Sequence, residues 1–199
     1  MSRPMRAARP AHKMAIRLVS LTLAAGLLAL VAACGKPAPR TTIQEFMEGE
    51  INPAGDFVFK SVQHISDGSG VHVKAPKDEA GWKAVRDQLM VLHDAPKVLT
   101  ADGLLAAKPG FKSEHPGIES EPAEIQAAVD KDRLDFNRRA FRLQSAASVA
   151  IKAVDSKDRD GLYRALDGID KACESCHLKY FYPRDNRAKQ AAKEDGITY

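Results

Sequence analysis

Cysteine, methionine and aromatic residues are all scarce in this sequence. Its 199 residues include three cysteines, five methionines and one tryptophan, and aromatic residues make up only 6%. So few cysteines exclude a domain stapled by several disulfides, and so few aromatic residues favour a helical domain over a β-sandwich. A second Cys-x-x-Cys pair and a His-x3-His cluster are also missing, so the chain lacks the usual fourth ligand of a structural zinc site.

Neither basic nor acidic residues are in large excess once the first 33 residues are set aside. The whole chain has 30 basic and 26 acidic residues, but five of the basic residues and none of the acidic ones precede residue 34. The remainder has 25 basic and 26 acidic residues, a net charge of −1. The basic character therefore belongs to the N-terminal segment, and we expect no nucleic-acid partner.

The N-terminal segment has the pattern of an export signal. Five basic residues precede an apolar run over residues 18–33, which at about 16 residues is short for a membrane span. The run ends in Val-Ala-Ala-Cys34, which resembles a bacterial lipobox. We expect a lipoprotein signal peptide at 1–33, a lipidated Cys34 and a Pro-rich tether over 34–40. The alternative is a soluble secreted protein cut nearby after Ala-x-Ala, with Cys34 incidental.

Four amphipathic segments follow the tether. Apolar residues at three- and four-residue spacing predict helices over about 43–65, 78–99, 122–154 and 161–180. Thr42 and Glu45 form a capping-box pattern before the first helix, and Pro53 predicts a kink or short break one turn beyond Met47. Glycine and proline mark loops over residues 66–77 and 100–121.

The short turn before the last helix makes the last two helices antiparallel neighbours. We therefore predict an all-α fold, an antiparallel four-helix bundle over residues 41–182. The charged C-terminal tail, residues 183–199, is expected to be frayed.

One motif in the last predicted helix carries chemistry. In Cys173-Glu-Ser-Cys176-His177, the two thiols are placed to add to the vinyl groups of a haem, and the histidine to bind its iron. Residues three and four apart share a helix face, so the three side chains converge. The motif predicts one covalent haem c, with Cys173 and Cys176 as thioether donors and His177 as the proximal iron ligand.

The same residue types also occur in two other kinds of site, a zinc site and a redox-active dithiol. A zinc half-site with His177 as third ligand would need a fourth ligand from elsewhere in the chain. A thioredoxin-like dithiol would need a βαβ context, and this region is predicted to be helical.

Four helices with Cys-x-x-Cys-His in the last one, followed by Tyr180, resemble the cytochrome c-prime family. The Ile43-x3-Met47 segment and the alanine-rich third helix add to the resemblance. It implies that the haem lies within the bundle and that the first helix faces the open side of the iron. Met47 would then be the distal ligand of a six-coordinate iron. In this sequence Phe181 stands where a basic residue often follows the aromatic one, so no role in propionate pairing is carried over.

For several other residues an ordinary structural role is the alternative to a role in binding. Met47 lies on the inward stripe of its helix, where a flexible core residue is the ordinary use of methionine. Met90 and Trp82 are expected to pack in the core, and the histidines outside the motif to lie at the surface: His64, His72, His93 and His115. A group of basic residues near the motif either docks an acidic redox partner or is a solvated face: Lys171, Lys179, Arg184, Arg187 and Lys189.

Together these patterns predict a periplasmic one-electron carrier held on a bacterial membrane by Cys34. Whether that membrane is the inner or the outer one is left open, and so is a homodimer. The expected partners are redox proteins of the periplasm or membrane. The alternative is a five-coordinate haem protein that binds nitric oxide or another diatomic gas. We expect no enzyme activity, because no general acid or base is identifiable near the motif.

Overall fold

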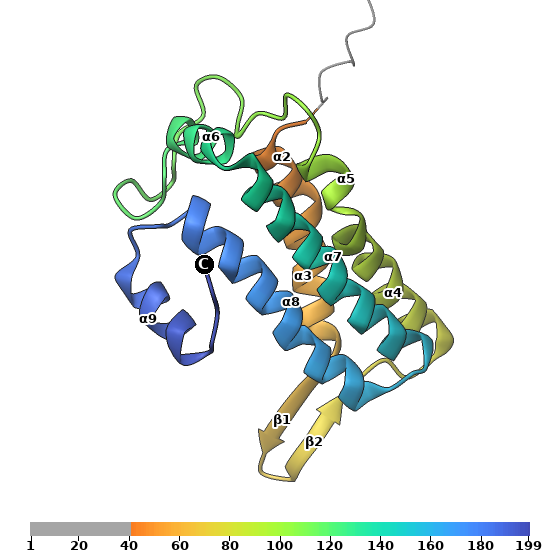
Figure 1. Ribbon diagram of the computed structural model, residues 1–199. Coiled ribbons are helices and arrows are strands. Elements are labelled where there is room, and N and C mark those ends of the chain that lie inside the picture. Colours follow the sequence, from red (N-terminus) through yellow and green to blue (C-terminus); the bar gives the residue numbers. More distant parts are fainter. Residues whose placement is uncertain (1–40) are drawn as a thin grey trace, which may run out of the picture. The chain divides into compact units, whose positions relative to one another are not determined.

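The computed structural model describes residues 41–199, so the predicted signal peptide, Cys34 and the tether lie outside the described residues. The described chain is mostly helical with one small hairpin (Figure 1). Its elements are α2 (Ile43–Phe46), the π-helical turn η3 (Met47–Ile51), α3 (Asn52–Ser61), β1 (Gln63–Asp67), β2 (Gly70–Lys74), α4 (Glu79–Asp94), α5 (Pro96–Leu99), α6 (Pro122–Lys131), α7 (Arg133–Asp155), α8 (Arg159–Tyr180) and α9 (Asn186–Glu194). Within residues 41–199, no helix has the length and apolarity needed to cross a membrane.

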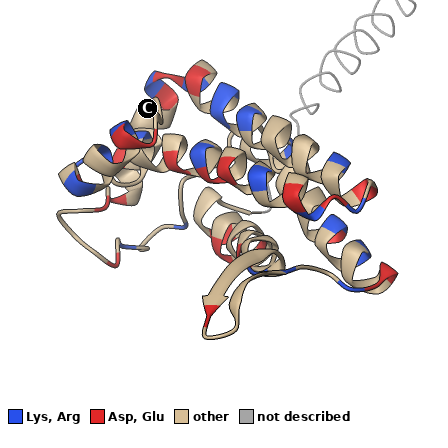
Figure 2. Cartoon of the chain, turned by 90° about the horizontal axis from the view of Figure 1, so that it is seen from below, with Lys and Arg blue, Asp and Glu red and all other residues tan. Residues whose placement is uncertain are grey.

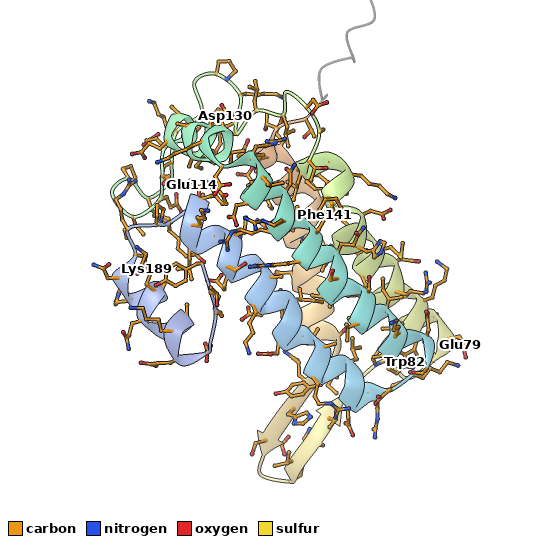
Figure 3. The ribbon with its side chains drawn as sticks, in the orientation of Figure 1. Glu79, Trp82, Glu114, Asp130, Phe141 and Lys189 are labelled. Carbon is orange, nitrogen blue, oxygen red and sulfur yellow. The ribbon has the colours of Figure 1, made fainter. Side chains whose placement is uncertain are left out.

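Helix α7 occupies the middle of the packing. It contacts α8 on one side and α4 on the other, and α3 packs against α4. α7 and α8 run in opposite directions after a short turn, as predicted (Figure 1). Trp82, expected in the core, is buried near the start of α4, and Figure 3 shows it at the end of the molecule where α7 finishes. Val85, Leu89 and Leu92 follow Trp82 at three- and four-residue spacing and are buried as well, so this face of α4 packs in the core.

The first helix begins as predicted and then departs from an α-helix. The Thr42 amide donates to the Glu45 carboxylate over 3.1 Å, and the Glu45 amide donates back to the Thr42 hydroxyl over 3.2 Å, which completes the capping box. From Met47 the chain makes a π turn, in which the Asn52 amide donates to the Met47 carbonyl. The irregularity expected from Pro53 is thus one wide turn that begins at Met47, and the helix continues without a break.

A β-hairpin replaces the end of the predicted first helix and most of the loop after it. Helix α3 ends at Ser61, not near residue 65, and β1 pairs antiparallel with β2. The paired residues Asp67 and Gly70 enclose Gly68-Ser69, and Gly70 closes the turn at a positive φ of 115°, a backbone conformation that favours glycine. The Asp67 carboxylate accepts a hydrogen bond from the Ser69 amide (2.9 Å), which holds the turn.

The predicted third helix is two helices. α6 ends and α7 begins at Asp132, whose backbone angles, φ −139° and ψ 58°, are not helical. Its carboxylate accepts a hydrogen bond from the Asp135 amide over 3.1 Å and so caps α7. A short acidic side chain that bonds its own backbone competes with helix continuation, and at Asp132 it prevails.

The C-terminal tail is folded, contrary to the prediction of a frayed end. Asp185 caps α9 by accepting hydrogen bonds from the amides of Arg187 and Ala188. Ala192 and Ile197 are buried with Leu178 of α8. The apolar face of this short helix thus covers the last turn of α8.

Candidate functional site

Both motif cysteines and His177 line one cavity of about 200 Å³. Cys173 and Cys176 are half-buried on α8 and pack against the same core as Ile169. The opposite wall comes from η3 and α3, including Met47. The structure therefore brings together the four residues of the described chain that were predicted to hold or face a haem. Most of the other residues that line the cavity are apolar: Ile51, Phe59, Leu92, Leu99, Phe136, Ala140, Leu143, Ile169 and Ala172.

A second cavity of about 370 Å³ adjoins the motif on the side of the long loop, residues 100–121. Figure 3 shows Glu114, one of its lining residues, in this loop near the C-terminal end of α8. Tyr180 and Phe181 line the same cavity. Five residues line both cavities, which places the motif between them: Met47, Asn52, Phe136, Cys176 and His177.

The long loop is tied at both of its ends. Near its start, the Leu105 and Ala106 carbonyls accept hydrogen bonds from the first amides of α2, each over 2.9 Å. At its end, the Ser120 amide donates to the Phe181 carbonyl over 2.6 Å. The loop is therefore a wall of the second cavity. Sequence reasoning identified the loop but not this role, although loops of such length are commonly functional.

The two thiols are held in their protonated form. Burial raises the pKa of Cys173 to about 12, with a further contribution from the neighbouring Cys176. Burial likewise raises the pKa of Cys176 to about 12. Redox-active Cys-x-x-Cys pairs have lowered thiol pKa values, commonly at a helix N-terminus, whereas these cysteines lie near the end of α8. The geometry disfavours a thioredoxin-like dithiol.

A buried ionic network stands beside the first cavity. Asp135 of α7 accepts hydrogen bonds from Arg139 (2.7 Å), Lys179 (2.7 Å) and the Tyr180 hydroxyl (3.2 Å). Arg139, which lines the cavity, also donates to the Ser175 carbonyl over 2.6 Å. Burial would raise the pKa of Asp135, but the hydrogen bonds from Lys179 and Arg139 outweigh it and hold that pKa far below its usual range. The network joins α7 to α8 next to Cys176.

Glu174, between the two cysteines, faces His177. Its Oε1 lies 3.6 Å from Nδ1 of His177, and its two oxygens lie 2.7 and 2.6 Å from the Tyr182 hydroxyl. The nearby His177 imidazole lowers the pKa of Glu174, although burial opposes the shift. The His177 ring also lies near two aromatic rings, with centroid distances of 6.0 Å to Phe181 and 5.8 Å to Tyr182.

The remaining histidines and Met90 lie away from this site. Among the described residues, no histidine other than His177 lines either cavity. His72 and His115 are exposed, His64 stacks on Tyr163, and His93 is half-buried beside Asp94. Met90 packs against the core, as predicted.

Much of the basic group near the motif is engaged within the protein. Lys171 pairs with Asp167 over 2.9 Å, and Arg184 pairs with Glu124 over 3.1 Å. Lys179 belongs to the Asp135 network. Figure 2 shows basic and acidic residues interspersed along the described helices. This arrangement favours the solvated face over a basic docking patch.

In the part of the chain that the structure describes, no three His, Cys, Asp or Glu side chains are grouped so as to hold a metal ion.

No family model, curated protein or solved structure matches this chain. What the site can do follows from its own chemistry.

Proposed function

We propose that the protein is a c-type cytochrome that carries single electrons. One haem c would be attached through Cys173 and Cys176, with His177 on the iron. The observation that carries the proposal is the convergence of both thiols and the imidazole on one cavity between α8, α7 and η3. Thioether attachment at Cys-x-x-Cys-His needs these three side chains on one helix face, and α8 presents them so.

The cavity walls fit a haem. They are mostly apolar, and the site combines two thiols with one imidazole, the donors of a c-type attachment. The bound haem supplies an iron centre that gains and loses one electron. Cys173, Cys176 and His177 would hold it, and Phe136, Leu143 and Ile169, which line the cavity, would exclude water from it. An apolar surrounding disfavours the more highly charged oxidised iron and thereby raises the reduction potential.

We further propose that the long helices form an antiparallel four-helix bundle of the cytochrome c-prime kind. The segment α2–η3–α3 would be its first member, followed by α4, α7 and α8. The sequential packing of α3 on α4, α4 on α7 and α7 on α8 supports this arrangement. The position of Met47 opposite the motif supports the role given to the first helix.

The location of the protein is proposed from the sequence. Lipidation of Cys34 would hold the domain on the periplasmic side of a bacterial membrane, where redox proteins would be its partners. Two or three acyl chains anchor a protein firmly, whereas one does not. The wild-type chain should therefore partition into detergent, and Cys34→Ala should release it. Processed wild-type protein found wholly in the soluble fraction would contradict the lipid anchor.

Covalent attachment is the direct test of the function. After denaturing electrophoresis, haem-dependent peroxidase staining should coincide with the protein band in the wild type. The double variant Cys173→Ala and Cys176→Ala should lose the stain, whereas Cys34→Ala should keep it as a control for cysteine loss. Extraction of all haem from the wild-type chain by acid acetone would refute the assignment.

A second candidate function is uptake of a diatomic gas by a five-coordinate haem. The observation in its favour is the 370 Å³ cavity beside Met47, which leaves space on the side of the long loop. If Met47 is an iron ligand, the wild type should be low-spin, should bind carbon monoxide slowly, and should become high-spin in Met47→Ala. A wild type that is already high-spin, with a spectrum unchanged by Met47→Ala, would favour gas binding.

A further inference from the structure

The second residue of the haem motif is placed to act on the iron ligand. Glu174 and His177 are three apart on α8, so they share a helix face. Nδ1 of His177 and Oε1 of Glu174 lie 3.6 Å apart, and both side chains are about one-third exposed, at 33% and 31%. A contraction of a few tenths of an ångström would make this contact a hydrogen bond.

Tyr182 holds the carboxylate at this place. Its hydroxyl lies 2.7 and 2.6 Å from the two oxygens of Glu174, while its backbone amide donates to the His177 carbonyl over 2.9 Å. One residue thus bonds the His177 carbonyl in the last turn of α8 and also holds the carboxylate beside the His177 ring. The rings of Phe181 and Tyr182 lie beside the His177 ring, with centroids 6.0 and 5.8 Å away.

The geometry points to Glu174 as a positioning residue that sets the orientation and tautomer of His177, an inference that rests on the proposed cytochrome function. With Nδ1 directed at the carboxylate, Nδ1 carries the ring proton and Nε2 is left for the iron. A carboxylate on the far nitrogen makes the imidazole a stronger donor, and a stronger donor stabilises the oxidised iron. Glu174 therefore lowers the reduction potential, against the effect of the apolar walls.

The test is the reduction potential of the haem-loaded Glu174→Gln variant. Mutation of an outer partner of a metal ligand commonly costs 10- to 100-fold in metal affinity or activity. By analogy we expect the redox equilibrium to shift about tenfold toward the reduced form. For a one-electron couple, tenfold corresponds to about 59 mV. The matched control is Asp167→Asn, which removes one acidic charge from the same helix at a side chain that is 66% exposed and paired with Lys171. Its potential should stay close to that of the wild type.

A second readout separates this role from a purely structural one. In a Met47→Ala background, the iron–histidine stretching frequency of the reduced protein should fall when Glu174→Gln is added, because the proximal bond weakens. Should the Gln variant fail to fold, Glu174→Asp keeps the charge but shortens the reach. That variant should also raise the potential.

The outcomes distinguish the inference from the function on which it rests. Equal potential shifts in Glu174→Gln and Asp167→Asn would reveal a general charge effect and overturn the inference. A lower melting temperature with unchanged potential and stretching frequency would also overturn it, since Glu174 and Tyr182 would then only pin the end of α8. In both cases covalent haem would leave the proposed function intact. A wild-type chain without covalent haem overturns both.

Discussion

At the scale of single residues, Asp135 stabilises a cation that is buried in the protein. The Arg139 side chain is only 6% exposed, and a buried cation without its partner is strongly destabilising. Asp135 supplies that partner and also accepts from Lys179 and Tyr180. One carboxylate thus holds α7 against the part of α8 that contains the Cys-x-x-Cys-His motif.

Asp135→Asn should therefore lower the free energy of unfolding by about 3 kcal/mol at pH 7, measured by urea denaturation. Asp167→Asn, which breaks an exposed pair, should lower it by less than about 1 kcal/mol. The pH dependence has a definite sign. Because the pKa of Asp135 is lower in the folded state, its contribution is present above about pH 4 and is lost as the pH falls through the folded pKa.

The difference between wild type and Asp135→Asn should accordingly shrink when the urea titrations are repeated at pH 3. A difference that is the same at both pH values would show that the charge of Asp135 is not what stabilises the network.

At the scale of elements, the π turn η3 decides where Met47 lies. A π turn inserts one extra residue into a helix, and such turns are frequent at functional sites. Residues before it are rotated by about 100° relative to a continuous α-helix, which is the angle of one residue. Met47 begins the turn and lines both cavities.

Deletion of Gly49 should convert η3 to regular α-helix and turn Met47 away from the motif. The haem spectrum of the deletion variant should then match that of Met47→Ala. Gly49→Ala is the matched control, because no atom lies within 4 Å of the Cβ that it would add, and its spectrum should match the wild type. If the deletion left the wild-type spectrum intact, the π turn would not be what positions Met47.

At the scale of the whole molecule, the site is a gap in the packing of the helical core. The cavity around the motif measures about 200 Å³ and has mostly apolar walls. A covalent apolar group that fills it would remove those walls from water and should stabilise the fold.

Haem-free wild-type chain should consequently unfold at lower denaturant concentration than the haem-loaded protein. The double variant Cys173→Ala and Cys176→Ala should resemble the haem-free wild type, which separates the loss of haem from the loss of the thiols. Equal midpoints for the loaded and haem-free chains would mean that the core is complete without the group.

Much of the helical structure and of the site follows from neighbours along the chain. The spacing of Cys173, Cys176 and His177 sets their common face on α8 because helix geometry is local. The same holds for the capping box of Thr42 and Glu45 and for the stripe of Trp82 on α4. These features involve residues within a few positions of each other, so the sequence by itself determined them.

The tertiary structure alone decided the rest, because it depends on contacts between distant residues. The Ser120 amide donates a hydrogen bond to the Phe181 carbonyl and so holds the long loop in place as a wall of the second cavity. Lys179 donates hydrogen bonds to Asp132 and Asp135 at the break between α6 and α7. The apolar periodicity of that segment did not reveal the break. The buried contacts of α9 with Leu178 likewise fold a charged tail that was expected to be frayed. In each case the stabilising contact joins residues that are distant in the sequence, and a local sequence pattern does not identify such pairs.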